Sequence, residues 1–201
     1  MIRSMTRSTI NNEVWYQSML AGNEAYSPTD FDLLQTTLLS TSTASVTFNS
    51  LNSYSAYKHL QIRMSTRGDT NWGGTTYLRM NSDTGTNYSR HHIGGYGSLV
   101  NGGNASATFI ALPFTVADSA ESASQAFGAS VVDIYDFAST SNNTTVRSFG
   151  GTRRTPPDSS AGVEIRSGAW LNTTAVTSLT ISGSSGLFLS GSRFSLYGIK
   201  G

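Results

Sequence analysis

Apolar and polar residues alternate along most of the chain from about residue 35 onward. Between Tyr57 and Arg67, for example, Leu60, Ile62 and Met64 alternate with polar neighbours. A period of two places successive side chains on opposite faces of a strand, so one face is dry and the other is wet. Clusters of Gly, Asn, Asp and Ser separate these segments and favour turns. The predicted strands are residues 36–39, 45–48, 57–67, 76–80, 88–93, 107–116, 127–137, 146–149, 163–170, 174–181 and 187–189, followed by a C-terminal strand.

The C-terminal strand pattern runs almost to the last residue. Phe194 and Leu196 are the apolar positions of an alternating stretch that ends at Ile199. A strand that holds together so close to a terminus needs neighbours on both sides, so we expect it to be internal to a sheet. Gly191 and Gly198 are predicted to be turn or close-approach positions.

The order of these segments predicts an all-β fold. Many strands without intervening helical patterns favour an antiparallel two-sheet β-sandwich, of jelly-roll type. Residues 127–137 are apolar on nearly both faces, which predicts a central strand. Residues 94–104, 118–124 and 153–158 are rich in Gly or small polar residues, and we expect them to be loops.

The first 34 residues follow a different pattern. Their apolar positions are spaced three to five apart, which favours a short helix that ends at Gly22 and Asn23. Pro28 blocks further helix, so we expect an extended linker up to Leu34. The chain is therefore predicted to have two parts, an N-terminal docking arm (residues 1–34) and a β-sandwich domain (residues 35–201).

The arm carries four aromatic residues whose rings we expect to be buried in a contact, namely Trp15, Tyr16, Tyr26 and Phe31. Each aromatic side chain can bury a large apolar area. The arm either folds back on its own domain or docks onto another subunit or protein. We favour docking, with these four residues as the contacts.

Composition limits the classes of partner. Only 12% of residues are charged and the formal net charge is +1, so we expect neither nucleic acid nor an anionic membrane as a partner. Cysteine is absent, so disulfides and thiolate metal sites are excluded. The N-terminus has no apolar run of signal-peptide length, and we expect the protein to be made in a cytoplasm.

Residue types that bind metals occur in unfavourable patterns. The adjacent His91 and His92 would point to opposite faces of a strand, and His59 lies on a wet face, so all three are expected to be structural or surface residues. Residues 81–87 are similar to the start of a calcium loop, but Asp83 is the sole carboxylate there and no bidentate Glu follows. A hairpin turn is the preferred interpretation, and no metal is expected.

No catalytic signature stands out. Asp133 and Asp136 lie three apart in a predicted strand, on opposite faces, which argues against a glycosidase pair built from them alone. Distant acids such as Glu121 and Glu164 remain open as partners. The sequence has no nucleophile elbow and no phosphate-binding loop. We therefore expect no enzyme activity and no cofactor.

A second kind of site comes from aromatic residues near Gly- and Asn-rich loops. Trp72, Tyr77, Tyr88 and Tyr96 could form a shelf on which a glycan stacks. Burial in the core or in a subunit contact is the alternative for these residues.

Several long motifs carry a resemblance to a known family. Residues 37–48, 57–63, 78–88 and 191–200 resemble, in this order, a family of tailed-phage virion proteins. Residues 20–34 are similar to the lead-in of members from marine and freshwater phages, especially cyanophages. The resemblance spans nearly all of residues 35–201 and implies a structural role, because members are described as tail, fibre-like or structural proteins.

The resemblance and the residue patterns together predict a structural virion protein. We expect a tail fibre or baseplate appendage subunit, docked by its arm onto other virion proteins, with an outward-facing sandwich and a homo-oligomeric state, favouring a trimer. One alternative is a capsid decoration (cement or head fibre) protein. Two others are a host-surface glycan-binding module and a depolymerase.

Overall fold

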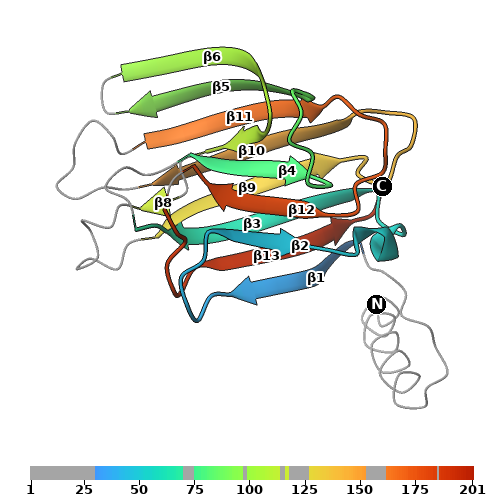
Figure 1. Cartoon of the computed structure of the whole chain (residues 1–201), viewed down its shortest axis with the longest axis horizontal. Helices are drawn as coiled ribbons and strands as arrows, with labels where there is room; N and C mark the ends of the chain where they lie inside the picture. Colours follow the sequence, from blue (N-terminus) through green and yellow to red (C-terminus); the bar gives the residue numbers. More distant parts are fainter. Residues whose placement is uncertain are drawn as a thin grey trace, which may run out of the picture.

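A computed structural model of the protein describes residues 30–69, 75–96, 99–113, 116–117, 127–152, 162–184 and 186–201. These residues form two β-sheets that face each other, which confirms the all-β sandwich (Figure 1). The large sheet has the order β1 (Phe31–Leu38), β13 (Arg193–Ile199), β3 (His59–Arg67), β9 (Gly128–Tyr135), β10 (Thr144–Thr152), β11 (Gly162–Trp170), β5 (Tyr88–Tyr96) and β6 (Leu99–Ala107), with β8 (Val116–Ala117) beside β3. The small sheet has the order β2 (Ser45–Phe48), β12 (Leu179–Gly183), β4 (Thr76–Met80) and β7 (Ile110–Leu112).

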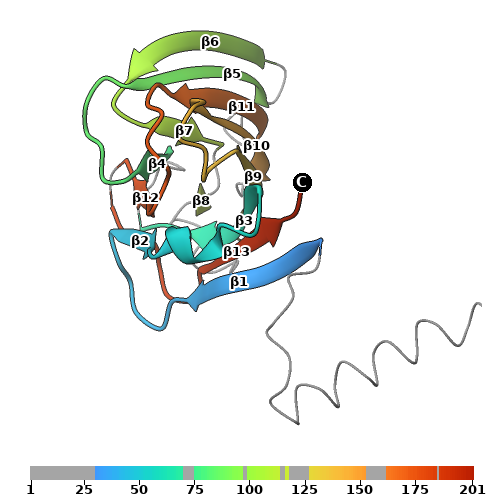
Figure 2. The ribbon, with the colours of Figure 1, turned by 90° about the vertical axis from the view of Figure 1, so that its right-hand side faces the viewer.

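The strand order is that of a jelly roll with two insertions. Strands β1, β13, β3 and β9 lie in one sheet, and β2, β12, β4 and β7 lie in the other, so the eight strands follow the double Greek-key order. Strands β5 and β6 are inserted between β4 and β7, and β10 and β11 between β9 and β12. These four strands continue the large sheet beyond β9, and the sheet curves along its length (Figure 2).

Strand β13 is internal to the large sheet, as predicted. It pairs antiparallel with β1 on one side and with β3 on the other. Its inward residues Phe194 and Leu196 are fully buried. Gly191 has φ +86° in the turn before the strand, a conformation that favours glycine. Gly198 lies under the ring of Tyr57, which leaves no room for a side chain.

The core lies between the two sheets and is filled mainly by the inward-facing side chains of their strands. Leu60, Ile62 and Met64 of β3 all point inward and are buried, as the sequence pattern predicts. Strand β9 lies between β3 and β10, which confirms its central place. The largest fully buried side chains are Trp170, Tyr88, Phe48, Phe137, Phe194, Leu51, Leu60, Ile62, Leu78, Met80, Ile110 and Leu112.

The prediction of a loop at residues 94–104 is wrong. Residues 94–96 complete β5 and residues 99–104 form most of β6, with Gly94 opposite Asn101 and Gly95 opposite Val100. Gly103 lets the ring of His92 lie against the backbone, since a Cβ there would sit 2.9 Å from the imidazole. Glycine therefore serves close packing here rather than a turn.

Other boundaries also differ from the predictions. The segment 107–116 is divided, because β6 ends at Ala107 and β7 begins at Ile110 in the other sheet. The segment 174–181 becomes a strand only at Leu179, and Phe188 makes isolated bridges instead of a strand. A short 3-10 helix, η1 (Leu51–Tyr54), precedes β3. The predicted loops 118–124 and 153–158 lie outside the described residues.

The prediction that residues 31–34 belong to a linker is wrong. Phe31 and Leu33 pair with Ile199 and Tyr197 of β13, so this segment is the first half of β1. The rest of the predicted arm, residues 1–29, lies outside the described residues. Where the structure describes the chain, no helix is long and apolar enough to span a membrane.

We predict that Gly198→Ala destabilises the fold. A Cβ at this position would meet three ring atoms of Tyr57 at 2.5 to 2.7 Å, and the hydroxyl of Tyr57 is held by a 2.6 Å hydrogen bond to Asp32. Such overpacking costs about 1–3 kcal/mol. Gly102→Ala is the control, because its Cβ would make only a 3.4 Å contact on an exposed strand. Urea unfolding measures both variants, and equal stability of the two would contradict the packing argument.

Candidate functional site

The turn at residues 81–87 has no free carboxylate for calcium. Oδ1 of Asp83 accepts the N–H of Gly85 at 2.8 Å, while Oδ2 accepts hydrogen bonds from Trp170 at 2.7 Å and Asn87 at 2.9 Å. These bonds, that of Trp170 first, lower the pKa of Asp83. The turn connects β4 to β5, which lie in different sheets, so a turn is confirmed but the prediction of a hairpin is wrong. Among the described residues, no group of three or more His, Asp or Glu could hold a metal ion.

The predicted glycan shelf does not form from the residues described. Tyr88 is fully buried, its hydroxyl accepts the N–H of Met80 at 3.1 Å, and burial raises its pKa. Tyr77 points to the outer side of β4, where its ring stacks on the ring of Phe109 with the two centroids 3.7 Å apart. The prediction for Tyr88 is wrong because its ring is part of the core. Trp72 and the side chain of Tyr96 lie outside the described residues.

A buried ion pair lies on the inward side of β11. The guanidinium of Arg166 donates from Nε to Oε2 of Glu164 at 2.9 Å and from Nη2 to Oε1 at 2.8 Å. The two side chains are 10% and 1% exposed. Both oxygens of this candidate acid are therefore engaged in a two-pronged pair. Glu121, the other distant acid, lies outside the described residues.

A polar strip crosses the outer face of β3, β9 and β10. Asp133 accepts a hydrogen bond from Gln61 at 2.8 Å and one from Arg147 at 3.0 Å. Gln61 in turn accepts from Arg63 at 2.9 Å. Asp136 lies beyond the end of β9 with φ +54°, so the expectation that it shares a strand with Asp133 is wrong.

The strip continues into an aromatic pair at the β1 edge. The ring of Phe31 stacks on Tyr197 with centroids 4.9 Å apart, and the guanidinium of Arg63 lies about 5 Å from both rings. Phe31, predicted as an arm contact, is thus half-exposed on the sandwich itself. Trp15, Tyr16 and Tyr26, the other predicted docking residues, lie outside the described residues.

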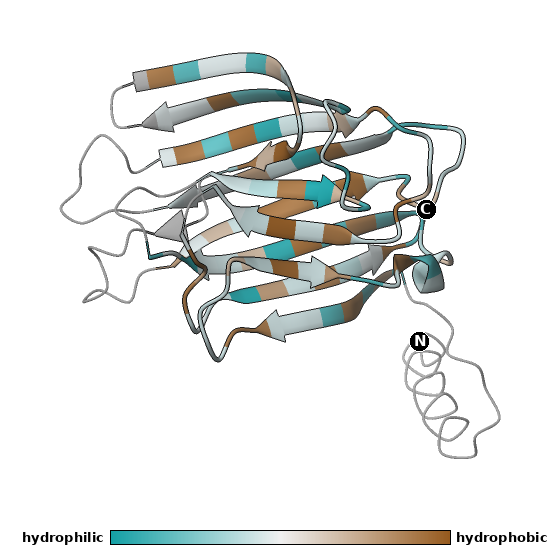
Figure 3. Ribbon diagram, viewed as in Figure 1, coloured by the Kyte–Doolittle hydropathy of each residue, from teal (hydrophilic) through white to brown (hydrophobic). Residues whose placement is uncertain are grey.

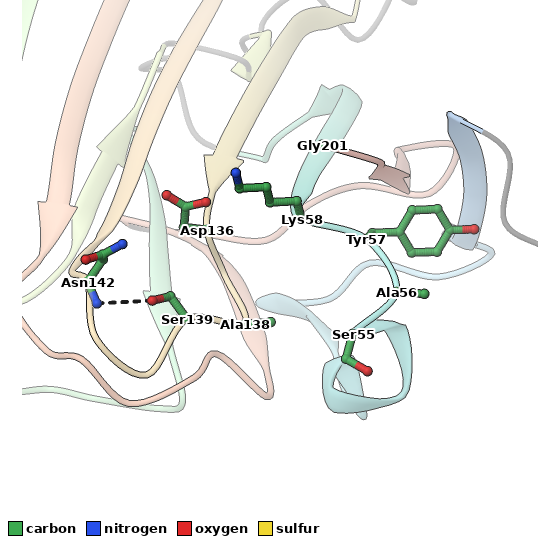
Figure 4. Close-up of a pocket in the computed structure, with 9 residues that line it drawn as sticks. All are labelled: Ser55, Ala56, Tyr57, Lys58, Asp136, Ala138, Ser139, Asn142 and Gly201. Atoms are coloured by element: carbon green, nitrogen blue, oxygen red, sulfur yellow. Dashed lines mark hydrogen bonds between the residues drawn. The ribbon is translucent and has the colours of Figure 1, made fainter.

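A polar cleft lies at one end of the sandwich, where the chain between η1 and β3 faces the turn after β9 (Figure 4). We call it the end cleft. Its volume is about 370 Å³. Lys58, Asp136 and Asn142 bring polar groups to it. The lining residues are Ser55, Ala56, Tyr57, Lys58, Asp136, Ala138, Ser139, Asn142 and Gly201.

A patch of exposed apolar side chains covers the outer face of the inserted strands. We call it the apolar field, and each of its members is between 50% and 81% exposed. Two rows of cross-strand neighbours make up the field. In the first row, Phe149 of β10, Ile165 of β11 and Ile93 of β5 lie side by side. In the second row, Val163 of β11 and Val100 of β6 lie on either side of Gly95 of β5. The brown bands on β11 in Figure 3 mark part of it. The field lines a shallow hollow of about 220 Å³.

Sequence reasoning identified the strand pattern of β11 but missed the field. In this strand Val163 and Ile165 point outward, while Glu164 and Arg166 point into the sandwich. An alternating pattern specifies two faces but does not say which one meets the core. The sequence signal for the inward face was the pair Glu164 and Arg166, two residues of opposite charge on the same side of the strand, which can neutralise each other when buried.

Comparisons with known proteins give no family. No model of a protein family matches the chain, and no curated protein sequence does. A solved exo-inulinase from Aspergillus awamori aligns with this chain at a TM-score of 0.34 and 13% sequence identity. The alignment covers 84% of this chain and 28% of the inulinase chain. The CBM2 module of the evolved Dit of Lactobacillus casei BL23 phage J-1 aligns at a TM-score of 0.18 and 9% identity, covering 91% of this chain and 85% of that one. Likenesses this low carry no argument about function.

We predict that Arg166→Met strongly destabilises the protein at neutral pH. The variant removes the guanidinium that donates to both oxygens of the buried Glu164 carboxylate, and loss of one partner of a buried pair costs about 3–5 kcal/mol. The double variant E164Q/R166M removes both charges and should recover part of that loss. Urea unfolding of both variants measures the difference. A single variant as stable as the wild type would show that the pair does not hold this part of the sheet.

Proposed function

We propose that the protein is a structural, non-enzymatic subunit of a tailed-phage virion, and that it forms a tail fibre or baseplate appendage. The apolar field is the observation that carries this proposal. Five adjoining side chains, each at least half exposed, form an apolar surface on the outer face of the large sheet. Contiguous apolar patches of this kind favour contact with another protein rather than with water.

The size of the contact energy favours an assembly with several contacts. Full burial of one apolar side chain contributes about 1.5–3 kcal/mol, so covering the exposed half of five contributes about 4–8 kcal/mol per subunit. Association costs about 4–15 kcal/mol. Burial of one apolar field therefore roughly offsets the cost of association. A symmetric oligomer, in which the same contact is repeated, is the favourable arrangement. A trimer remains our proposal for that oligomer.

The neighbouring edge strand supports the same interpretation. Strand β6 is nine residues long, lies at the end of the large sheet and contains no charged residue and no proline. In monomeric proteins, edge strands usually carry charged residues or proline, which block pairing with another chain. The edge of β6 adjoins the field, so one neighbour can contact both.

Docking through the N-terminal arm remains part of the proposal. Trp15, Tyr16 and Tyr26 would provide its apolar contacts with other virion proteins. Because Phe31 belongs to β1, the arm in this proposal ends at Asp30. The runner-up function, capsid decoration, would use the same field and arm on capsid subunits, so particle location distinguishes the two.

We predict that Ile165→Glu dissociates the oligomer. A carboxylate in the middle of the apolar field would be buried without a partner in any contact made there. Leu171→Glu is the matched control, because Leu171 is 53% exposed but lies outside the field. Sedimentation velocity should give a multiple of 21.4 kDa for the wild type and the control, and the single-chain mass for Ile165→Glu. Thermal unfolding by circular dichroism checks that the monomer is folded, and an unchanged oligomer would count against the field as the interface.

A further inference from the structure

We propose that the end cleft is a binding site for a neutral saccharide, held through adjacent hydroxyl groups. The site lies at the end of the large sheet between the segment Ser55–Lys58 and the turn that follows β9. It is separate from the apolar field, whose residues lie on β5, β6, β10 and β11. Its volume of about 370 Å³ is at the lower end of the range for small-molecule sites, which is suitable for a sugar ring.

Two oppositely charged side chains face the cleft without contacting each other. Figure 4 shows the ammonium of Lys58 and the carboxylate of Asp136 on the same side of the cleft, with the amide of Asn142 beside them. The structure describes both charged side chains, and neither an ion pair nor a hydrogen bond links them. A ligand group can therefore occupy the space between a donor and an acceptor.

The chemistry of these groups selects a hydroxylic ligand. An ammonium only donates hydrogen bonds and a carboxylate only accepts them. A hydroxyl does both, so two adjacent hydroxyls can accept from Lys58 and donate to Asp136 at once. A singly charged ligand would meet one like charge, that of Asp136 for an anion or of Lys58 for a cation, beside one opposite charge. Its attraction and repulsion would largely cancel, whereas a neutral hydroxylic molecule meets no repulsion. The amide of Asn142 adds one donor group and one acceptor.

The backbone that carries this carboxylate is held in place before any ligand binds. Asp136 has φ +54°, a left-handed conformation that Asp tolerates better than most residues. Its backbone N–H donates to Nδ1 of His59 at 3.1 Å, and the ring of His59 meets the ring of Tyr135 edge-on at 5.2 Å. Preorganised groups lose little freedom on binding, which favours affinity for a small ligand.

The turn that carries Asp136 is held closed by its own hydrogen bonds. The hydroxyl of Ser139 accepts the backbone N–H groups of Ser141 and Asn142 at 3.2 and 3.1 Å. The N–H of Ser139 donates to the carbonyl of Asp136 at 2.9 Å. These bonds close the turn around the residues that line the cleft, so Asp136 and Asn142 keep their relative positions.

The test is saturation-transfer NMR of the full-length protein with single sugars. Glucose, galactose, mannose, rhamnose and N-acetylglucosamine are the neutral probes, and glucuronic acid and glucosamine are the charged ones. We expect at least one neutral sugar to bind and both charged sugars to bind more weakly. Binding of no neutral sugar, or preference for a charged one, would overturn the proposal.

Variants assign the binding to the cleft. Asp136→Asn keeps the shape and the left-handed backbone, and Lys58→Met keeps the length of the side chain without its charge. Each should weaken binding of the neutral sugar about tenfold or more, the loss expected for one hydrogen bond to a charged group. Asp30→Asn, an exposed residue outside the cleft, is the control and should bind as the wild type does. Equal binding by all three variants would place the sugar elsewhere and reject the cleft, whereas the oligomer measured for Ile165→Glu is independent of this result.

Discussion

The pairing of β13 between β1 and β3 is the constraint on which the rest of the fold depends. Strand β1 has no partner among the described residues except β13, and its register joins Phe31 to Ile199 across almost the whole chain. Phe194 and Leu196 also contribute buried side chains to the core. Because such distant contacts form late and at a large loop-closure cost, the sandwich closes only when its last strand is in place.

The apolar field lies where the large sheet continues beyond this closed unit. Strands β10, β11, β5 and β6 continue the large sheet past β9, beyond the eight strands of the jelly roll. On this extension the usual polarity is reversed, since Glu164 and Arg166 are buried as a pair while Val163 and Ile165 face outward. The extension thus contributes Trp170 and Tyr88 to the core on its inward face, and on its outward face it exposes the surface that we propose as a contact.

Alternation alone was enough to predict much of the core. It gave β2 and β4 with their observed bounds and the inward face of β3. It failed at residues 94–104, where glycines pack against a neighbouring strand, and at Glu164, whose burial depends on a partner two residues away. The end cleft could not be predicted, because only the pairing of β3 with β9 brings Lys58 and Asp136 to the same end of the sheet.

The central claim is that the protein is an appendage subunit on the virion, and its place on the particle tests that claim most directly. Immunogold labelling of intact particles with an antibody against the sandwich is the measurement. We expect gold at the tail or baseplate. Gold spread over the head would contradict the appendage and favour capsid decoration, and particles without gold would contradict a structural role in the virion altogether.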